Sequence, residues 1–373
     1  MRIGIITFHK AENFGSALQA YALSMYLKKI GHEVKIIDFE YNFDLRQYNL
    51  FRKHLYLKRP QAFAADLLYI RKNRKRKNAF KKFRADFLML TESTYSYQAS
   101  NLNELNNDFD CFVCGSDQIW NLNCTEVLVP EYFLSFADTG KLKVSFAPSM
   151  PTKVQEKFYS ELRPLINRLD FVSVREAQTV EYLKKEVGLI DKQIEHFVDP
   201  TLLLDDHDYI SGFNLKREDR HIFVYLLGKE HISSVIEEAN NLQKKTGLPI
   251  KYVFMRKITN LNNSEYLFGV GPIEFLNLIY NAEYVLTDSF HATVFSNIFE
   301  IKYCAFPREG SSSRMTELVD SLGMNYRFYG NDKVWFLKNM DGAAIHKEIS
   351  KLAVNTKDTF DKWISNYPKE MEN

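Results

Sequence analysis

MRIGIITFHKAENFGSALQAYALSMYLKKIGHEVKIIDFE, residues 1–40, contains two short apolar runs separated by a helical pattern. Residues 2–7 form the first run, which is typical of a buried strand, and residues 16–30 carry apolar side chains at helical spacing. Gly31 ends that pattern, and residues 34–38 form the second apolar run. We therefore predict a β-α-β unit of a parallel sheet.

The same alternation continues along the chain. Further strands are predicted at 111–114, 144–147, 171–174 and 194–198, and a helix at 176–186. A polar stretch at 205–220 is interpreted as a linker, after which strands and helices alternate again up to residue 306. We expect an α/β chain with two Rossmann-like, doubly wound domains that face a cleft.

The predicted domains are assigned by residue range. Residues 1–204 form the N-terminal domain, with a basic helical insertion at about 45–98, and residues 205–343 form the C-terminal domain. Residues 344–373 show helical spacing and are predicted to pack back on the first domain.

Composition excludes several classes of protein. The chain has 373 residues, a formal charge of +2, 45% hydrophobic and 26% charged residues, which is ordinary for a globular protein. Four cysteines do not make a disulfide framework, and no apolar run is long enough for a membrane span. The start turns polar too early for a signal peptide, so we expect a cytoplasmic protein.

The neutral total hides one basic block. Thirteen Lys and Arg residues and a single acid, Asp66, lie between Arg52 and Arg84. A solvated helix face explains such a block. The alternative hypothesis uses the interleaved Phe and Leu residues and predicts contact with an anionic membrane, at its inner face. No nucleic-acid binding motif accompanies the block, so nucleic acid is not an expected partner.

Ligands of open α/β sheets bind beyond the carboxyl ends of the strands, so the loops after the strands are candidate sites. In the first loop Asn13, Gly15 and Ser16 open a helix, whose terminal N–H groups could bind an oxyanion. A turn alone also explains Gly15.

The second loop follows the strand at 111–114 and presents Gly115, Ser116, Asp117 and Gln118, small and polar groups that suit sugar hydroxyls. Trp120 fits a stacking platform or, as is more common, the core. The Cys111 and Cys114 side chains should point to opposite faces of the strand, which favours two buried structural cysteines over a redox or metal pair.

The third loop combines a helix start with a titratable group. Asp288 is predicted as the N-cap, with Ser289, His291 and Thr293 in the first turn. Backbone N–H groups, hydroxyls and an imidazole would then converge on one point, which predicts an anion site. The alternative is that His291 only caps the helix.

Two arginines follow predicted strands. Arg175 ends the strand at 171–174, and Arg314 follows a Gly-Ser loop that begins at Arg308. The guanidinium group matches carboxylates and phosphates in bidentate geometry. Either arginine could instead form an ion pair.

Taken together, five motifs resemble the polysaccharide pyruvyl transferase family over about residues 1–325. They occur in order at residues 13–23, 112–121, 173–176, 199–203 and 287–295. The resemblance implies a GT-B-like fold and transfer of the enolpyruvyl group of phosphoenolpyruvate to a sugar of a surface or exopolysaccharide, which forms a pyruvate ketal.

The resemblance also implies roles for particular residues. The acceptor would bind the first domain and the donor the second. His291 would be the essential histidine near phosphoenolpyruvate, Arg175 would anchor the substrate, and no metal or other cofactor would be needed. Whether the saccharide acceptor is lipid-linked is left open.

One departure keeps alternatives open. Family members have Arg-Leu-His where this chain has Ser289-Phe-His, so Arg308 or Arg314 would have to supply the missing charge. The chain could otherwise be a GT-B-type glycosyltransferase, with Glu274 or Glu309 binding the ribose of a nucleotide sugar. A non-catalytic glycan-binding relative is the third reading.

Overall fold

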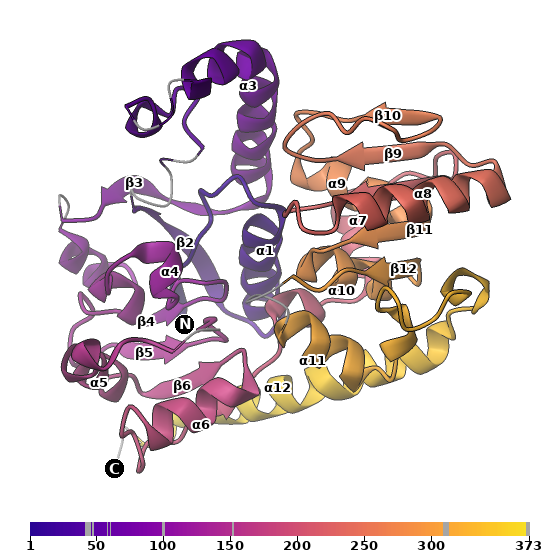
Figure 1. The fold of residues 1–373 in the computed structure, drawn as a ribbon. Helices are drawn as coiled ribbons and strands as arrows, with labels where there is room; N and C mark the ends of the chain where they lie inside the picture. Colours follow the sequence, from indigo (N-terminus) through magenta and orange to yellow (C-terminus); the bar gives the residue numbers. More distant parts are fainter. Residues whose placement is uncertain are drawn as a thin grey trace. The chain divides into compact units, whose positions relative to one another are not determined.

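The computed structural model describes residues 1–41, 46, 48–57, 59, 61–98, 101–150, 153–308 and 313–370. The chain divides into two compact units (Figure 1). The first unit comprises Met1–Arg71, Phe80–Leu203 and Leu352–Asn373, and the second comprises Lys72–Ala79 and Leu204–Lys351.

The first unit is built on a seven-stranded parallel sheet with the order β3-β2-β1-β4-β5-β6-β7. The strands are β1 (Arg2–Ile6), β2 (Glu33–Glu40), β3 (Leu90–Ser96), β4 (Cys111–Cys114), β5 (Leu142–Ser145), β6 (Phe171–Val174) and β7 (Glu195–His196). Ile3 of β1 pairs with Val34 on one side and with Cys111 on the other, as in the predicted β-α-β unit.

The central elements are buried because their sequences are apolar. Every residue of β4 and β5 is buried, as expected for inner strands of a parallel sheet covered on both faces. The helices of this unit are α1 (Phe14–Lys29), α4 (Leu122–Thr125), α5 (Tyr159–Asn167) and α6 (Ala177–Lys185), and α3 (Gln61–Phe87) belongs to it except for Lys72–Ala79. Helix α1 is buried on nearly all sides, which its many Ala, Leu and Tyr residues permit.

The second unit is built on a five-stranded parallel sheet with the order β10-β9-β8-β11-β12. The strands are β8 (His221–Tyr225), β9 (Ile250–Val253), β10 (Ser264–Tyr266), β11 (Ala282–Thr287) and β12 (Lys302–Ala305). The helices are α7 (Asp206–Gly212), α8 (Ile232–Thr246), α9 (Pro272–Tyr280), α10 (Phe290–Ile298) and α11 (Ser313–Ser321). The prediction of an α/β chain with two Rossmann-like sheets is therefore confirmed.

Helix α12 (Gly342–Glu370) contributes to both units. Its Phe360 packs against Phe146 and Phe171, with ring centroids 5.1 and 5.7 Å apart. Tyr26 of α1 donates a hydrogen bond to Asp361 at 2.6 Å. The C-terminal part of α12 is thus fixed to the first unit by an aromatic cluster and a hydrogen bond.

The interpretation of 205–220 as a linker is wrong for its first half. Asp205 and Asp208 form a reciprocal capping box that starts α7. Tyr209 of this helix is fully buried, and its ring lies 5.0 Å from that of Phe295. The three Asp residues that look like a loop in the sequence are therefore helix-start residues.

The region at about 45–98 holds more than a helical insertion. Helix α3 is followed directly by β3, which pairs in parallel with β2 and forms an edge of the first sheet. Most of β3 is exposed or half-buried, so its sequence lacks the apolar run of an inner strand. Among the helices in the described ranges, none is both long and apolar enough to cross a bilayer.

Candidate functional site

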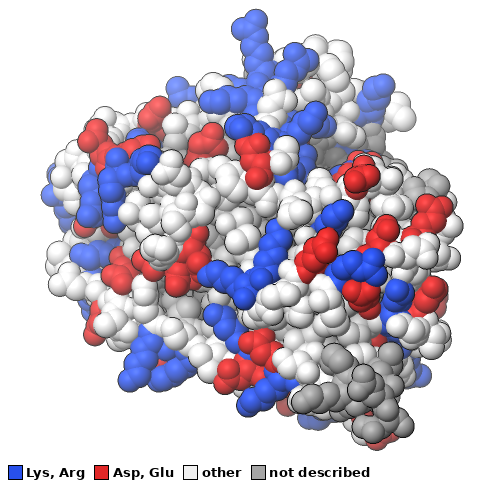
Figure 2. Space-filling view, turned by 180° about the vertical axis from the view of Figure 1, so that it is seen from behind, with Lys and Arg blue, Asp and Glu red and all other residues white. Residues whose placement is uncertain are grey.

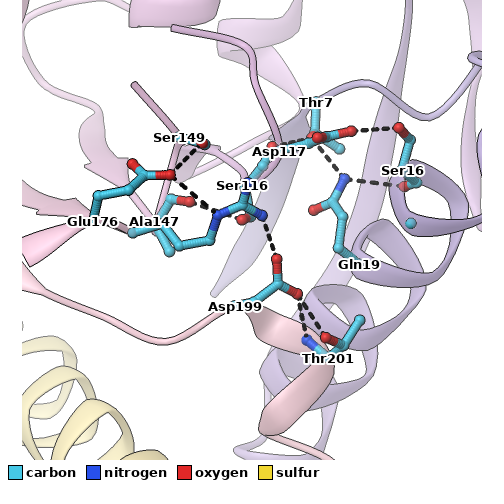
Figure 3. A network of polar contacts seen from close by, with 12 residues as sticks. Thr7, Ser16, Gln19, Ser116, Asp117, Ala147, Ser149, Glu176, Asp199 and Thr201 are labelled. Carbon is cyan, nitrogen blue, oxygen red and sulfur yellow. Dashed lines mark hydrogen bonds and ion pairs between the residues drawn. The ribbon is translucent and has the colours of Figure 1, made fainter. Parts of the chain in front are cut away.

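A buried polar network lies at the carboxyl end of the first sheet (Figure 3). Thr7 follows β1, and its hydroxyl donates to the carbonyl oxygen of Ser116 at 2.8 Å. The Gln19 amide of α1 donates to the Thr7 hydroxyl and to the Ser16 carbonyl oxygen, each at 3.0 Å. These contacts join two of the loops singled out by the sequence.

Asp117 is held in this network in an uncommon backbone conformation. Its φ is +69°, in the left-handed region that few residues other than glycine adopt. The Ser16 hydroxyl donates to its carboxylate, and its carbonyl oxygen accepts the Ser149 N–H at 2.7 Å. Ala147, at the end of the neighbouring β5, also has a positive φ, +51°. Such conformations at adjacent strand ends mark a candidate functional position.

Asn13 and the helix start are already engaged with each other. Asn13 is the N-cap of α1, and its side-chain oxygen accepts the N–H groups of Gly15 at 2.9 Å and Ser16 at 3.4 Å. An oxyanion at this helix start would therefore have to displace the Asn13 cap.

The second loop has packing roles as well as polar groups. A Cβ on Gly115 would lie 3.1 Å from that of Thr7, so glycine permits this close approach. The Ser116 hydroxyl donates to the Ala147 carbonyl oxygen at 2.7 Å, and the Gln118 side-chain oxygen accepts from Asn121 at 2.6 Å.

The core reading of Trp120 and the structural reading of the two strand cysteines are confirmed. Trp120 is buried and stacks on Phe133 with centroids 4.8 Å apart. Cys111 and Cys114 are buried free thiols on β4. Burial raises the pKa of both thiols, which makes them poor nucleophiles.

Arg175 directly follows β6 and is buried between carboxylates. It donates to Asp199, and its Nε lies 3.7 Å from a Glu176 carboxylate oxygen. Burial disfavours its charge, but Asp199, Glu176 and Asp117 raise the pKa of Arg175 above its ordinary value. Asp199 also accepts the Thr201 N–H at 3.0 Å. The guanidinium therefore organises a buried acidic cluster in the first unit.

Sequence reasoning missed a second charged group at the same end of the sheet. His9 is fully buried; its Nε2 lies 2.9 Å from Asp38 of β2, and its Nδ1 lies 3.2 Å from the Thr7 carbonyl oxygen. Lys10 contacts Asp38 at 2.9 Å and Glu40 at 2.6 Å. Burial opposes ionisation of Asp38, yet hydrogen bonds from His9, Thr94 and Lys10 lower its pKa well below the usual range. The feature of the sequence that could have indicated this group is the pair His9 and Lys10, which follows the first apolar run directly.

In the second unit Asp288 has a different role from the predicted one. Ser289, not Asp288, is the N-cap of α10, and its hydroxyl accepts the Ala292 N–H at 3.4 Å. Asp288 instead accepts the N–H groups of Leu227 at 2.6 Å and Gly228 at 2.7 Å, after β8. Burial raises the pKa of the Asp288 carboxyl, and these donors oppose that shift. Asp288 therefore joins the loop after β11 to the loop after β8, and does not cap α10.

His291 lies in the first turn of α10, with only 9% of its surface exposed. Its ring is 5.0 Å from that of Phe290. Thr293 is fully buried, and its hydroxyl donates to the Ser289 carbonyl oxygen at 3.1 Å.

Two arginines lie near the start of α10. Arg308 follows β12, and its Nε is 3.6 Å from an Asp288 carboxylate oxygen. The Arg314 guanidinium on α11 is 5.6 Å from the Phe290 ring centroid. Residues 309–312, which include Glu309, lie outside the described residues. Glu274 caps the start of α9 through the Gly271 N–H at 2.9 Å, so its carboxylate is engaged in helix capping.

The structure thus gathers the predicted site residues into two groups, one in each unit. The first follows the strands of the seven-stranded sheet and contains Asn13, Gly15, Ser16, Gly115, Ser116, Asp117, Gln118 and Arg175. The second surrounds the start of α10 and contains Asp288, Ser289, His291, Thr293 and Arg314. Within the described residues, no group of three or more His, Cys, Asp or Glu side chains is arranged to hold a metal ion.

The solved structures that this chain matches share little sequence with it. UDP-GlcNAc 2-epimerase of Methanocaldococcus jannaschii is 12% identical, with 95% of this chain and 100% of that chain covered and a TM-score of 0.47. The Neisseria meningitidis epimerase bound to UDP-GlcNAc is 11% identical, with 97% and 93% covered and a TM-score of 0.47. E. coli heptosyltransferase WaaC with ADP is 14% identical, with 95% and 100% covered and a TM-score of 0.41.

A search of curated proteins finds no match. The sequence model of the polysaccharide pyruvyl transferase family, in contrast, matches residues 13–308. That range begins at the N-cap of α1, ends at Arg308, and includes nearly all of both groups of site residues. The chain therefore belongs to the polysaccharide pyruvyl transferase family and is a transferase.

Proposed function

We propose that this transferase moves the pyruvyl group of phosphoenolpyruvate to two hydroxyls of a saccharide, as a cyclic ketal. The observation that carries the proposal, beside the family match, is the pair of arginines near the start of α10. His291, Arg308 and Arg314 all lie there, although Ser289 replaces the arginine of the family motif. Phosphoenolpyruvate carries a carboxylate and a phosphate, which arginines and a helix N-terminus bind well.

The reaction needs one proton donor and one group that accepts hydroxyl protons. In the proposal His291 protonates the methylene carbon, because histidine is the side chain that most often serves as a positioned general acid. A saccharide hydroxyl bonds to the adjacent carbon and phosphate leaves with its oxygen. A second hydroxyl then bonds to the same carbon and closes the ketal. Of the two hydroxyl protons released, one replaces the proton that His291 gave and the other leaves with the phosphate.

The first unit is the proposed saccharide side. Asp117, Ser16 and Gln118 present a carboxylate, a hydroxyl and an amide at the strand ends, the types of group that bind sugar hydroxyls.

Ligand-induced stabilisation tests the donor. Phosphoenolpyruvate at about 100 times its Kd should stabilise the protein by about 2.7 kcal/mol, measured as a rise in Tm, while nucleotide sugars should have no effect. Phosphate release in the presence of a suitable saccharide then tests turnover. A rise in Tm with a nucleotide sugar alone would favour a glycosyltransferase, and donor binding without any phosphate release would favour a non-catalytic glycan-binding protein.

Gly228 allows a second test of the donor side. A Cβ added there would lie 2.9 Å from the Arg308 Cδ and 3.2 Å from an Asp288 oxygen, so the Arg308 side chain must move. We expect Gly228→Ala to weaken phosphoenolpyruvate binding by about tenfold, the value of one charge-assisted hydrogen bond, with little change in Tm. Titration calorimetry measures this change. Gly140→Ala is the control, because its Cβ would meet nothing within 4 Å; equal affinities for the two variants would contradict the assignment of Arg308.

A further inference from the structure

The segment from Phe51 to Arg71 exposes an unusual set of large apolar side chains within the first unit. Leu57 is 98% exposed and Leu68 is 73% exposed, in a chain whose apolar residues are otherwise mostly buried. We call this set, with its neighbouring cations, the α3 surface. Its exposed apolar members are Phe51, Leu57, Phe63, Leu67 and Leu68, and its exposed cations are Lys53, Arg59 and Arg71.

An internal contact fixes the α3 surface in shape. Asp66 is fully buried and accepts from the Arg52 backbone N–H and the Arg52 Nε, both at 2.8 Å, and from the Tyr56 hydroxyl at 2.9 Å. The Tyr56 ring also packs edge-on against Phe63, with centroids 5.4 Å apart. Arg52 and Tyr56, which precede α3, are thus tied to the first turns of the helix, while Leu57, Leu67 and Leu68 stay exposed.

The same contact removes the negative charge from the surface. Asp66 is the only acidic residue between 51 and 71. Burial opposes its ionisation, but Arg52 and Tyr56 lower the pKa of its carboxyl, so the charge is retained inside and neutralised by Arg52. The exposed charges of the α3 surface are therefore all positive. Figure 2 shows Lys and Arg side chains gathered at the top of the view, where α3 lies.

Apolar side chains combined with cations, and with no exposed acid, match one occupant best. An anionic lipid surface accepts leucine and phenylalanine side chains between its headgroups and attracts lysine and arginine. A second copy of this surface would bring like charges together, which costs free energy. Nucleic acid would use the cations but would leave Leu57 and Leu68 in water.

We propose that the α3 surface binds anionic membranes peripherally. The inference goes beyond the proposed function and does not depend on it, because membrane binding is measured without donor or acceptor.

Co-sedimentation of the full-length protein with vesicles tests the inference. We expect binding to vesicles of 70% phosphatidylcholine and 30% phosphatidylglycerol, and at least about tenfold weaker binding to phosphatidylcholine alone. Salt at 0.5 M should weaken binding to the anionic vesicles, because it screens the charges. Leu57→Ser/Leu68→Ser and Lys53→Glu/Arg59→Glu should each lower the partition coefficient by about tenfold or more.

Matched variants elsewhere in the first unit separate a local effect from a general one. Ile190 is 74% exposed, and Lys153 and Lys185 are exposed cations, so Ile190→Ser and Lys153→Glu/Lys185→Glu change the same properties at other sites. We expect both control variants to bind like the unaltered protein. The inference would be overturned if binding did not depend on phosphatidylglycerol, or if the partition coefficient fell equally in the control variants. A dimer in sedimentation velocity that Leu57→Ser/Leu68→Ser abolishes would assign the surface to a second copy and would also overturn it.

Discussion

We expect His291→Ala to lower the proposed turnover of phosphoenolpyruvate by about 10²–10⁴-fold, the usual contribution of a positioned general acid. The reason is that His291 lies in the first turn of α10, whose neighbours Asp288 and Phe290 are approached by Arg308 and Arg314. Phosphate release under saturating donor measures kcat. Because the arginines remain, donor affinity should change much less than kcat, and this split separates proton transfer from binding.

A second histidine of the same unit provides the control for His291. His346 is a partly exposed residue of α12 that lies 3.3 Å from Glu300. We expect His346→Ala to keep the turnover of the unaltered protein. The Tm of both variants must also be measured, because His291 is buried and its removal leaves a small cavity. Near-normal turnover of a folded His291→Ala protein would disprove the role of His291 as the acid.

The parts of the fold that the sequence predicts well are those with a strong local pattern. The first β-α-β unit has apolar runs and a helix with Asn13 at its N-cap, all within forty residues. The edge strands β3 and β10 were not predicted, because they are largely exposed and carry few apolar side chains. The sequence of helix α7 looks like that of a linker, because a capping box and a turn use the same residue types.

The sequence predicts which loops form the candidate site, but it does not predict which charged side chains contact each other there. Arg175 and Asp199 are 24 positions apart, and His9 and Asp38 are 29 apart, so only the register of the parallel strands brings them together. The same is true of Asp288, whose partners follow β8, some sixty residues earlier. A single sequence carries no local signal for such contacts. A site at the strand ends can therefore be predicted from the sequence, but the residue with which each charged side chain pairs cannot.

The buried cluster around Arg175 predicts the largest effect on stability. Replacing Arg175 with methionine keeps most of the side-chain volume but leaves Asp199 and Glu176 buried without their cation. We expect Arg175→Met to lower the free energy of unfolding by about 3–5 kcal/mol, measured by urea denaturation. Arg220 provides the comparison, because its ion pair with Glu283 is exposed. Arg220→Met should cost at most about 1 kcal/mol.

A double-mutant cycle distinguishes an organising role of Arg175 from direct anchoring of substrate. If Arg175 acts mainly on Asp199, then Arg175→Met/Asp199→Asn regains part of the stability that Arg175→Met loses, with a coupling of about 0.5–3 kcal/mol. Arg175→Lys retains a positive charge and should fold even if Arg175→Met does not, so it keeps the comparison measurable. If Arg175 instead holds substrate, Arg175→Met keeps its stability and loses turnover. The contacts of the guanidinium favour the first outcome, because it already binds Asp199 and lies beside Glu176 in a region with almost no solvent exposure.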